Sequence, residues 1–193
     1  MTTSEKTSTS IPIAASTVSA ALEVPEDVQL AVEASGKSVN AAQIEVLRRT
    51  ICAKLDNNQL LLYLTRCARK GIDPFCDAYA FPQSDGGLAM GLRIDGMQAL
   101  ASRTGELLSI KVETILVPEG EKKGELLGAR CTIERKGMTA PVVEEAYMAE
   151  YYHSGMGWDR FPETMIRKVA RAKCLRMAFA DALGGIFDPE EME

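Results

Sequence analysis

The chain has 193 residues, 46% of them hydrophobic, and a mass of 21.0 kDa, which is enough for one ordinary domain and a tail. Its formal net charge of −5, from 22 basic and 27 acidic residues, excludes a generally basic nucleic-acid-binding protein. No apolar run approaches the roughly 18 residues that a membrane span requires, so we expect no membrane partner.

Composition and charge change along the chain and predict three regions. Residues 1–38 are rich in Ser, Thr and Ala, so we expect a disordered or weakly ordered N-terminal tail. Residues 39–185 are expected to form a single core domain, and residues 186–193 an acidic C-terminal tail. Five acidic residues and no basic residue lie in 181–193, so the rest of the chain carries 22 residues of each sign.

Polar capping residues predict two helices at the start of the core. Asn40 is a suitable N-cap for a helix that reaches about residue 55. Asp56 or Asn57 can cap a second helix, and Gly71 is placed to end it. Both segments carry apolar residues at helical spacing, so each helix is expected to bury one side.

The remaining elements predict an α+β fold. A short helix capped by Asp95 is expected to end at residue 103, a loop is expected at 153–157, and a long helix from 162 to about 183. Five runs predict strands: 76–82, 88–94, 107–117, 126–135 and 139–148. The order predicts an antiparallel sheet, a hairpin plus a three-strand meander, packed with helices and with the long C-terminal helix.

The predicted last helix holds the most basic segment of the chain. Only Asp159 and Glu163 oppose six basic residues there: Arg160, Arg167, Lys168, Arg171, Lys173 and Arg176. At 100° per residue, Arg167 and Arg171 lie about 40° apart and Lys168 roughly 60° further round, so these three form one basic stripe. Arg176 points elsewhere and is expected to be partly buried, where a guanidinium needs a carboxylate or a phosphate. Two interpretations are open: a solvated basic face with one internal salt bridge, or a phosphate-binding groove.

Aromatic residues gather close to the same segment: Tyr147, Tyr151, Tyr152, Trp158 and Phe161. Cations that follow the backbone and rings that stack on bases, at about 1–3 kcal/mol per base, are together typical of a single-stranded nucleic-acid site. Alternatively, most of these rings fill the core, because aromatic residues make up only 6% of the chain.

Two further hypotheses compete with nucleic-acid binding. The first is a magnesium-dependent nuclease, in which Glu119 and Glu134 would hold Mg²⁺ while Lys136 orients the attacking water. That motif is weak, because Glu-x-Lys is common in a chain with this much charge. The second is a non-catalytic scaffold whose basic helix binds an acidic protein.

No other motif predicts a cofactor, a metal or a catalytic residue. The five cysteines are widely spaced without a Cys-x-x-Cys pair, and the single histidine, His153, cannot assemble a His-rich metal site. The glycines form neither a dinucleotide motif nor a Walker motif, so no ATP site is indicated. Cysteine usage favours a reducing compartment and the N-terminus does not resemble a signal peptide, so we expect a cytoplasmic protein.

Three separated blocks of the sequence resemble the lambda Red Bet and RecT family of phage single-strand annealing proteins. The first two are Gly-Ile-Asp-Pro-Phe at 71–75 with Tyr-Ala-Phe-Pro at 79–82, and Ile-Asp-Gly-Met at 94–97. The third is the closing segment, where matching residues fall in order and spacing: Trp158, Pro162, Met165, Arg167, Ala170, Cys174, Arg176, Ala178, Phe179 and 185–188. The resemblance covers roughly residues 55–190.

The resemblance implies an ATP-independent protein that binds single-stranded DNA, anneals complementary strands and promotes homologous recombination, and that is not an enzyme. It implies a homo-oligomer, as a ring or a helical filament, in the cytoplasm of a bacterial host cell. Single-stranded DNA and the annealed duplex intermediate are the expected partners. A phage exonuclease and the host single-strand-binding protein are further candidates.

The resemblance also assigns four DNA-binding positions, Arg135 and Lys136 on the sheet and Arg167 and Arg176 on the last helix. From charge and aromatic character alone we add five more: Trp158, Arg160, Lys168, Arg171 and Lys173. Together they predict a basic groove that grips the phosphate backbone and leaves the bases free to pair.

Overall fold

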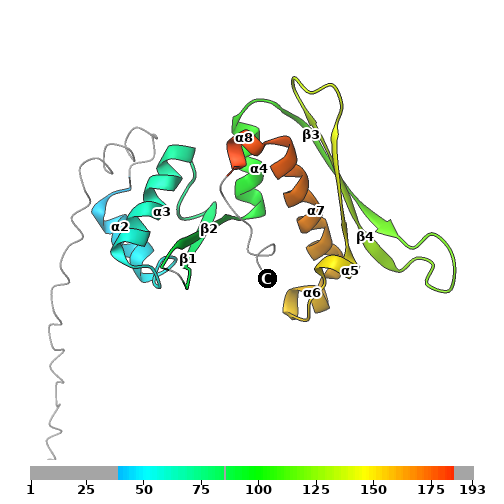
Figure 1. The fold of residues 1–193 in the computed structure, drawn as a ribbon, viewed down its shortest axis with the longest axis horizontal. Coiled ribbons are helices and arrows are strands. Elements are labelled where there is room, and N and C mark those ends of the chain that lie inside the picture. The colour runs from blue at the N-terminus through cyan, green and yellow to red at the C-terminus, as the bar shows by residue number, and fades with distance from the viewer. Residues whose placement is uncertain (1–38, 85, 185–193) are drawn as a thin grey trace, which may run out of the picture.

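The folded part of the chain has two groups of elements (Figure 1). The computed structural model describes residues 39–84 and 86–184, so the tails predicted at 1–38 and 186–193 lie outside the described residues. The first group contains two helices and a hairpin: α2 (Ala41–Arg49), α3 (Asn57–Lys70), β1 (Ala78–Pro82) and β2 (Leu88–Leu92). The second contains a sheet and five helices: α4 (Ile94–Arg103), β3 (Leu107–Leu116), β4 (Leu126–Arg135), β5 (Val142–Tyr147), α5 (Met148–Tyr151), α6 (Met156–Arg160), α7 (Pro162–Ala178) and α8 (Ala180–Leu183). The predicted α+β class, with an antiparallel hairpin, a three-strand meander and a long C-terminal helix, is confirmed.

Helices α2 and α3 each begin with a capping box. The Asn40 side chain accepts a hydrogen bond from the Gln43 N–H, and the Gln43 side chain accepts one from the Asn40 N–H. Asp56 and Gln59 repeat this arrangement at the start of α3. Helix α3 ends as predicted at Gly71, whose φ of 64° lies in the left-handed region that suits glycine.

Two predicted helix ends are wrong. Helix α2 stops at Arg49 and not near residue 55, because the Cys52 N–H closes a 2.8 Å bond back to the helix and carries Cys52 into the core. Helix α4 has Arg93 at its N-cap, with no side-chain capping bond. Asp95 lies one residue inside the helix, where its charge is favourable near the positive end of the helix dipole.

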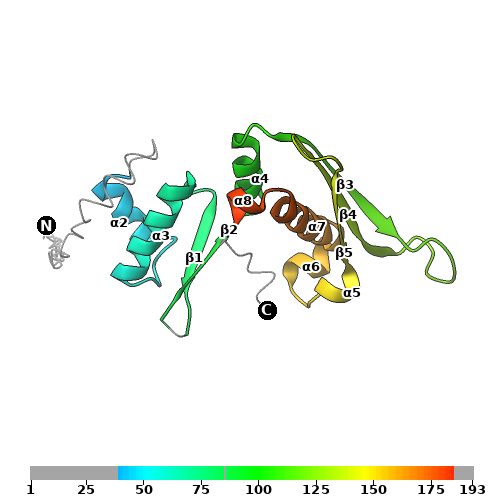
Figure 2. The same cartoon turned by 45° about the horizontal axis from the view of Figure 1, so that its top comes forward.

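Helix α7 packs along one face of the sheet β3–β4–β5, and α4 lies on the far side of α7 (Figures 1 and 2). Residues of β4 alternate between a buried and an exposed face of the sheet. Cys131 and Ile133 are fully buried, whereas Arg130 and Glu134 are exposed. Every fourth residue of α7 is fully buried: Ile166, Ala170, Cys174 and Ala178. This burial fixes the orientation of the helix that carries the basic stripe.

Gly128 allows β4 and β5 to lie close together. A Cβ at Gly128 would collide with the Ala146 carbonyl oxygen, a backbone atom of the neighbouring strand. We expect Gly128→Ala to lower the free energy of unfolding by about 1–3 kcal/mol through overpacking, as measured by urea denaturation. Gly155→Ala is the matched control, because a Cβ there meets nothing within 4 Å. Equal stability losses in the two variants would contradict this reading of the strand contact.

The predicted long last helix is interrupted at Phe179. Helix α7 ends one residue earlier, and α8 is a separate short helix, because Phe179 has a non-helical φ of −127° and ψ of 43°. The Ala178 carbonyl accepts a hydrogen bond from the Arg135 guanidinium of β4 and not from a following helical N–H. A side chain from the sheet therefore takes the place of the next helical bond.

The segment between β5 and α7 also differs from the prediction. Short helices α5 and α6 are present, and residues 156 and 157 of the expected 153–157 loop belong to α6. Strand β5 begins three residues later than predicted, directly after Pro141, which has no N–H to donate to a sheet. Within the described part of the chain, no helix is long and apolar enough to cross a membrane.

Candidate nucleic-acid interface

A hollow of about 430 Å³ lies between α7 and β3. It is lined by one residue of β3 and five of α7: Val112, Glu163, Thr164, Arg167, Lys168 and Arg171. The three cations of the predicted stripe, Arg167, Lys168 and Arg171, therefore open onto one space with a single carboxylate among them. We call this feature the cation-lined hollow. Its local excess of positive charge stands against a net charge of −5 for the chain.

Arg167 joins the hollow to the edge of the sheet. Its guanidinium donates to the Val112 carbonyl at 3.2 Å and lies 3.5 Å from the Glu163 carboxylate. Glu163 also accepts a 2.7 Å hydrogen bond from the Thr114 hydroxyl of β3, and this bond holds the pKa of the Glu163 carboxyl below its usual value. Glu163 is therefore ionised near neutral pH, and it is held toward β3.

Arg171 and Lys168 differ in how firmly they are held. Arg171 donates to the Gln98 side chain at 3.2 Å and lies 3.8 Å from the Asp95 carboxylate, and both partners belong to α4. Lys168 has no hydrogen bond or ion pair from its ammonium group to any residue in 39–84 or 86–184. Lys168 thus has no ion pair among the described residues, and the arginines on either side of it, Arg167 and Arg171, have only long, partly exposed ion pairs.

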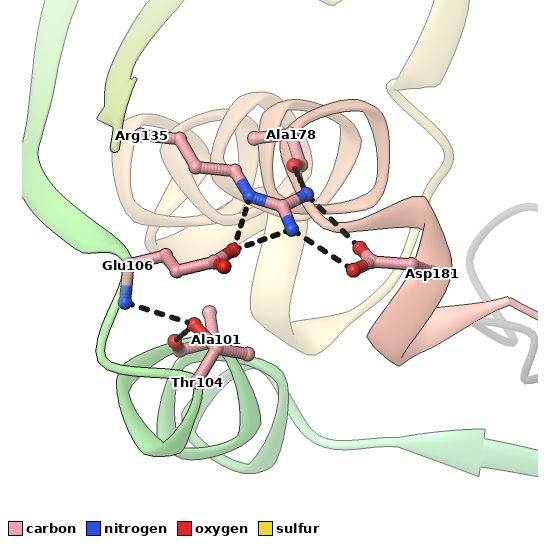
Figure 3. Close-up of polar contacts among 6 residues, drawn as sticks. All are labelled: Ala101, Thr104, Glu106, Arg135, Ala178 and Asp181. Carbon is pink, nitrogen blue, oxygen red and sulfur yellow. Dashed lines mark hydrogen bonds and ion pairs between the residues drawn. The ribbon is translucent and has the colours of Figure 1, made fainter. Parts of the chain in front are cut away.

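Arg135 lies in a different place and is fully engaged (Figure 3). Its Nε and Nη2 donate to Glu106 at 2.9 and 2.6 Å, and its Nη1 and Nη2 donate to Asp181 at 2.9 Å each. Nη1 also donates to the Ala178 carbonyl at 2.5 Å, and the guanidinium lies 4.6 Å from the Phe179 ring centre. All five guanidinium N–H groups are therefore used within the fold. The assignment of Arg135 as a DNA contact stays a prediction.

Three other predicted cations do not line the hollow. Lys173 turns toward β5, where its ammonium donates to the Glu145 carbonyl at 2.8 Å and lies 3.5 Å from the Glu144 carboxylate. The Arg176 side chain is partly buried, as predicted, with its guanidinium nitrogens out of contact with solvent. Lys136 is exposed just beyond β4. Their assignment as DNA contacts stays a prediction.

The aromatic residues divide into core and surface. Trp158 is only 3% exposed and packs edge-on against Tyr152 at a centroid distance of 6.3 Å, so its faces are not open for stacking. This agrees with the alternative that a given ring belongs to the core. Tyr152 and Phe161, in contrast, are 52% and 61% exposed. Arg160, between Trp158 and Phe161, is exposed as well.

The nuclease hypothesis is wrong on geometry. Glu119 lies in the turn after β3, whereas Glu134 and Lys136 lie near the opposite end of β4. Eight residues of extended strand separate the two ends, which is about 27 Å at roughly 3.4 Å per residue. Carboxylates that far apart cannot ligate one ion. In the described residues, no group of three or more His, Cys, Asp or Glu side chains could hold a metal.

Two residues that support the hollow from outside α7, Gln98 and Thr114, were not predicted from the sequence. Gln98 lies 73 positions from its partner Arg171, and Thr114 lies 49 positions from Glu163. Contacts at such separations leave no local pattern. Thr114 shares a face of β3 with Val112, which also lines the hollow, but no motif marks either residue in the sequence.

A comparison with known families agrees with this arrangement. A model of the RecT family matches residues 37–193, and this match places the chain among DNA-binding proteins of recombination and strand annealing. The chain belongs to the RecT family, and the resemblance predicted from the sequence is confirmed. A comparison with curated proteins gives no match.

Proposed function

We propose that this protein binds single-stranded DNA at the cation-lined hollow and anneals complementary strands without ATP, thereby promoting homologous recombination. The observation that carries the proposal is the placement of Arg167, Lys168 and Arg171 around one space on an otherwise acidic chain. Membership of the RecT family supports it.

Phosphate groups fit the hollow better than carboxylates of the fold do. The ion pairs of Arg167 and Arg171 are long, at 3.5 and 3.8 Å, and their acidic partners are exposed, so these pairs contribute little to stability. A phosphate can accept two parallel bonds from either guanidinium, and the Lys168 ammonium has no competing partner among the described residues. Exchange of these weak internal contacts for phosphate contacts is therefore favourable.

Binding through phosphates leaves the bases available. Neutralised phosphates lower the repulsion between two polyanionic strands, so a second strand can approach the first. Correct pairing then adds stacking of about 1.4 kcal/mol per base step, which makes the annealed duplex the stable product. No covalent step, metal or nucleotide cofactor enters this mechanism.

One hollow is too small to hold a useful length of DNA, so the proposal includes an oligomer. Adjacent copies in a ring or helical filament would align their hollows into a continuous groove. The same proposal places the protein in the cytoplasm of a bacterial host, with a phage exonuclease and the host single-strand-binding protein as candidate partners. The five donors of Arg135 are occupied within the fold, so a direct DNA contact would require Arg135 to exchange some of these bonds for bonds to a phosphate.

The function itself is tested by mixing the protein with two complementary labelled oligonucleotides in the absence of ATP. The proposal predicts faster duplex formation than in buffer alone. The remaining alternative, a scaffold that binds an acidic protein, predicts no acceleration and no binding of either oligonucleotide.

The single substitution Lys168→Gln tests whether Lys168 contacts a phosphate of the bound strand. Loss of one phosphate contact should weaken single-stranded DNA binding about fivefold near 0.1 M salt and make the salt slope shallower by about 0.7. Fluorescence anisotropy at several salt concentrations measures both quantities. Lys54→Gln removes the same charge from an exposed lysine in the turn between α2 and α3, and it should leave both unchanged. Identical behaviour of the two variants would contradict the assignment of Lys168.

A further inference from the structure

Phe161 joins α6 to α7 and lies at the N-terminal end of α7, in the half of the helix that lines the cation-lined hollow. Its exposed fraction is 61%, whereas Trp158, three residues earlier, is 3% exposed. A single exposed apolar side chain is common on protein surfaces. What distinguishes Phe161 is its place at the end of α7 that lines the cation-lined hollow.

The backbone of Phe161 is held by hydrogen bonds to both neighbouring helices. The Phe161 N–H donates to the Gly157 carbonyl of α6 at 2.9 Å, and the Phe161 carbonyl accepts from the Met165 N–H of α7 at 3.0 Å. Buried Trp158 anchors α6 beneath the corner. The backbone position of Phe161 is therefore set before DNA binds, which reduces the entropy that ordering this corner would cost.

Phe161 is the N-cap of α7, directly before the first residue of the helix. Thr164, Lys168 and Arg171 line the hollow, share one face of the helix and follow Phe161 at three, seven and ten positions. At 1.5 Å per residue, Phe161 lies about 4.5 Å along the axis from Thr164 and about 10 Å from Lys168. Phe161 and the cations are therefore near enough along α7 to contact neighbouring nucleotides of one strand.

We propose that Phe161 is a stacking platform for an unpaired nucleobase of the strand whose phosphates occupy the cation-lined hollow. The inference rests on the proposed function. A ring of this kind accepts any base, because every base has a flat π-face. A base inside a duplex is already stacked on both sides, so the platform is expected to act on the single strand before annealing.

The test uses Phe161→Ala and two oligonucleotides of equal length, one normal and one abasic, that carry the same phosphates. Affinity for the normal oligonucleotide should fall roughly five- to a hundredfold with no change in salt slope. Affinity for the abasic oligonucleotide should be equal in the variant and the wild type. Phe161→Trp should restore binding, and the emission of the added indole should be quenched by the normal oligonucleotide only.

Met177→Ala is the matched control, because Met177 is also 61% exposed on α7 but lies at the other end of the helix. It should leave all affinities unchanged. If Phe161→Ala weakens binding to both oligonucleotides equally, or changes the oligomeric state without DNA, the ring contacts something other than a base and the inference is overturned. If the wild type binds both oligonucleotides and Phe161→Ala binds as tightly, only the stacking role fails. If the wild type binds neither, the proposed function fails as well.

Discussion

Replacing all three cations of the hollow with glutamine (Arg167→Gln, Lys168→Gln and Arg171→Gln) should weaken single-stranded DNA binding about 100-fold near 0.1 M salt. Each phosphate contact adds about −0.7 to the logarithmic salt slope for a single strand, so three contacts account for a slope of about −2. Annealing should be lost in the same variant, because it depends on the bound strand. Anisotropy titrations across a range of salt concentrations measure the affinity and the slope together.

The control for this variant removes the same charges elsewhere. Arg49→Gln, Lys54→Gln and Arg69→Gln neutralise two arginines and one lysine that are exposed on and between α2 and α3. The net charge of the two triple variants is identical, so any general electrostatic effect appears in both. A salt slope that is unchanged in the hollow variant, or lowered equally in both, would mean that DNA binds elsewhere.

The second large effect is expected on stability, in Arg135→Gln. Removal of the guanidinium leaves the Glu106 and Asp181 carboxylates facing each other without a cation and leaves the Ala178 carbonyl without its donor. We expect a melting temperature several degrees below that of the wild type near pH 7, by differential scanning calorimetry. Arg135→Lys keeps the positive charge but loses the five donors of the guanidinium. Its melting temperature should therefore lie between those of the wild type and Arg135→Gln.

The same ion pair predicts a pH dependence. The hydrogen bond from Arg135 lowers the pKa of Asp181 below its usual value of 3.8, so the stabilisation from this pair is complete only at pH values well above 3.8. It is lost as the pH falls through the lowered pKa of the folded state. The difference in melting temperature between wild type and Arg135→Gln should therefore shrink from pH 7 to about pH 3. A variant that melts like the wild type but has a shallower salt slope would instead make Arg135 a direct DNA contact.

Local signals in the sequence were sufficient for most of the fold. The N-caps predicted at Asn40 and at Asp56 or Asn57, and the glycine stop at Gly71, all depend on residues close in sequence. The structure has Asn40, Asp56 and Gly71 in these roles. The break at Phe179 could not be predicted in this way. It accompanies a bond from Arg135 across 43 positions of sequence, which no pattern within the helix records.

The candidate site was predictable in part. Helical spacing alone placed Arg167, Lys168 and Arg171 on one stripe, and the hollow confirms that they share a space. Charge could not show that Arg135 is already saturated by Glu106 and Asp181, because those contacts join residues 29 and 46 positions apart. Sequence spacing also could not separate buried Trp158 from an exposed ring such as Phe161, since both depend on how α6 packs against α7.

Lysine footprinting can show whether phosphates of single-stranded DNA occupy the cation-lined hollow. The wild-type protein is acetylated with and without an excess of oligonucleotide, and the modification of each lysine is measured by mass spectrometry. Lys168 should be strongly protected by DNA, whereas Lys54, an exposed lysine outside the hollow, should react equally in both samples. Equal acetylation of Lys168 with and without bound oligonucleotide would contradict the account.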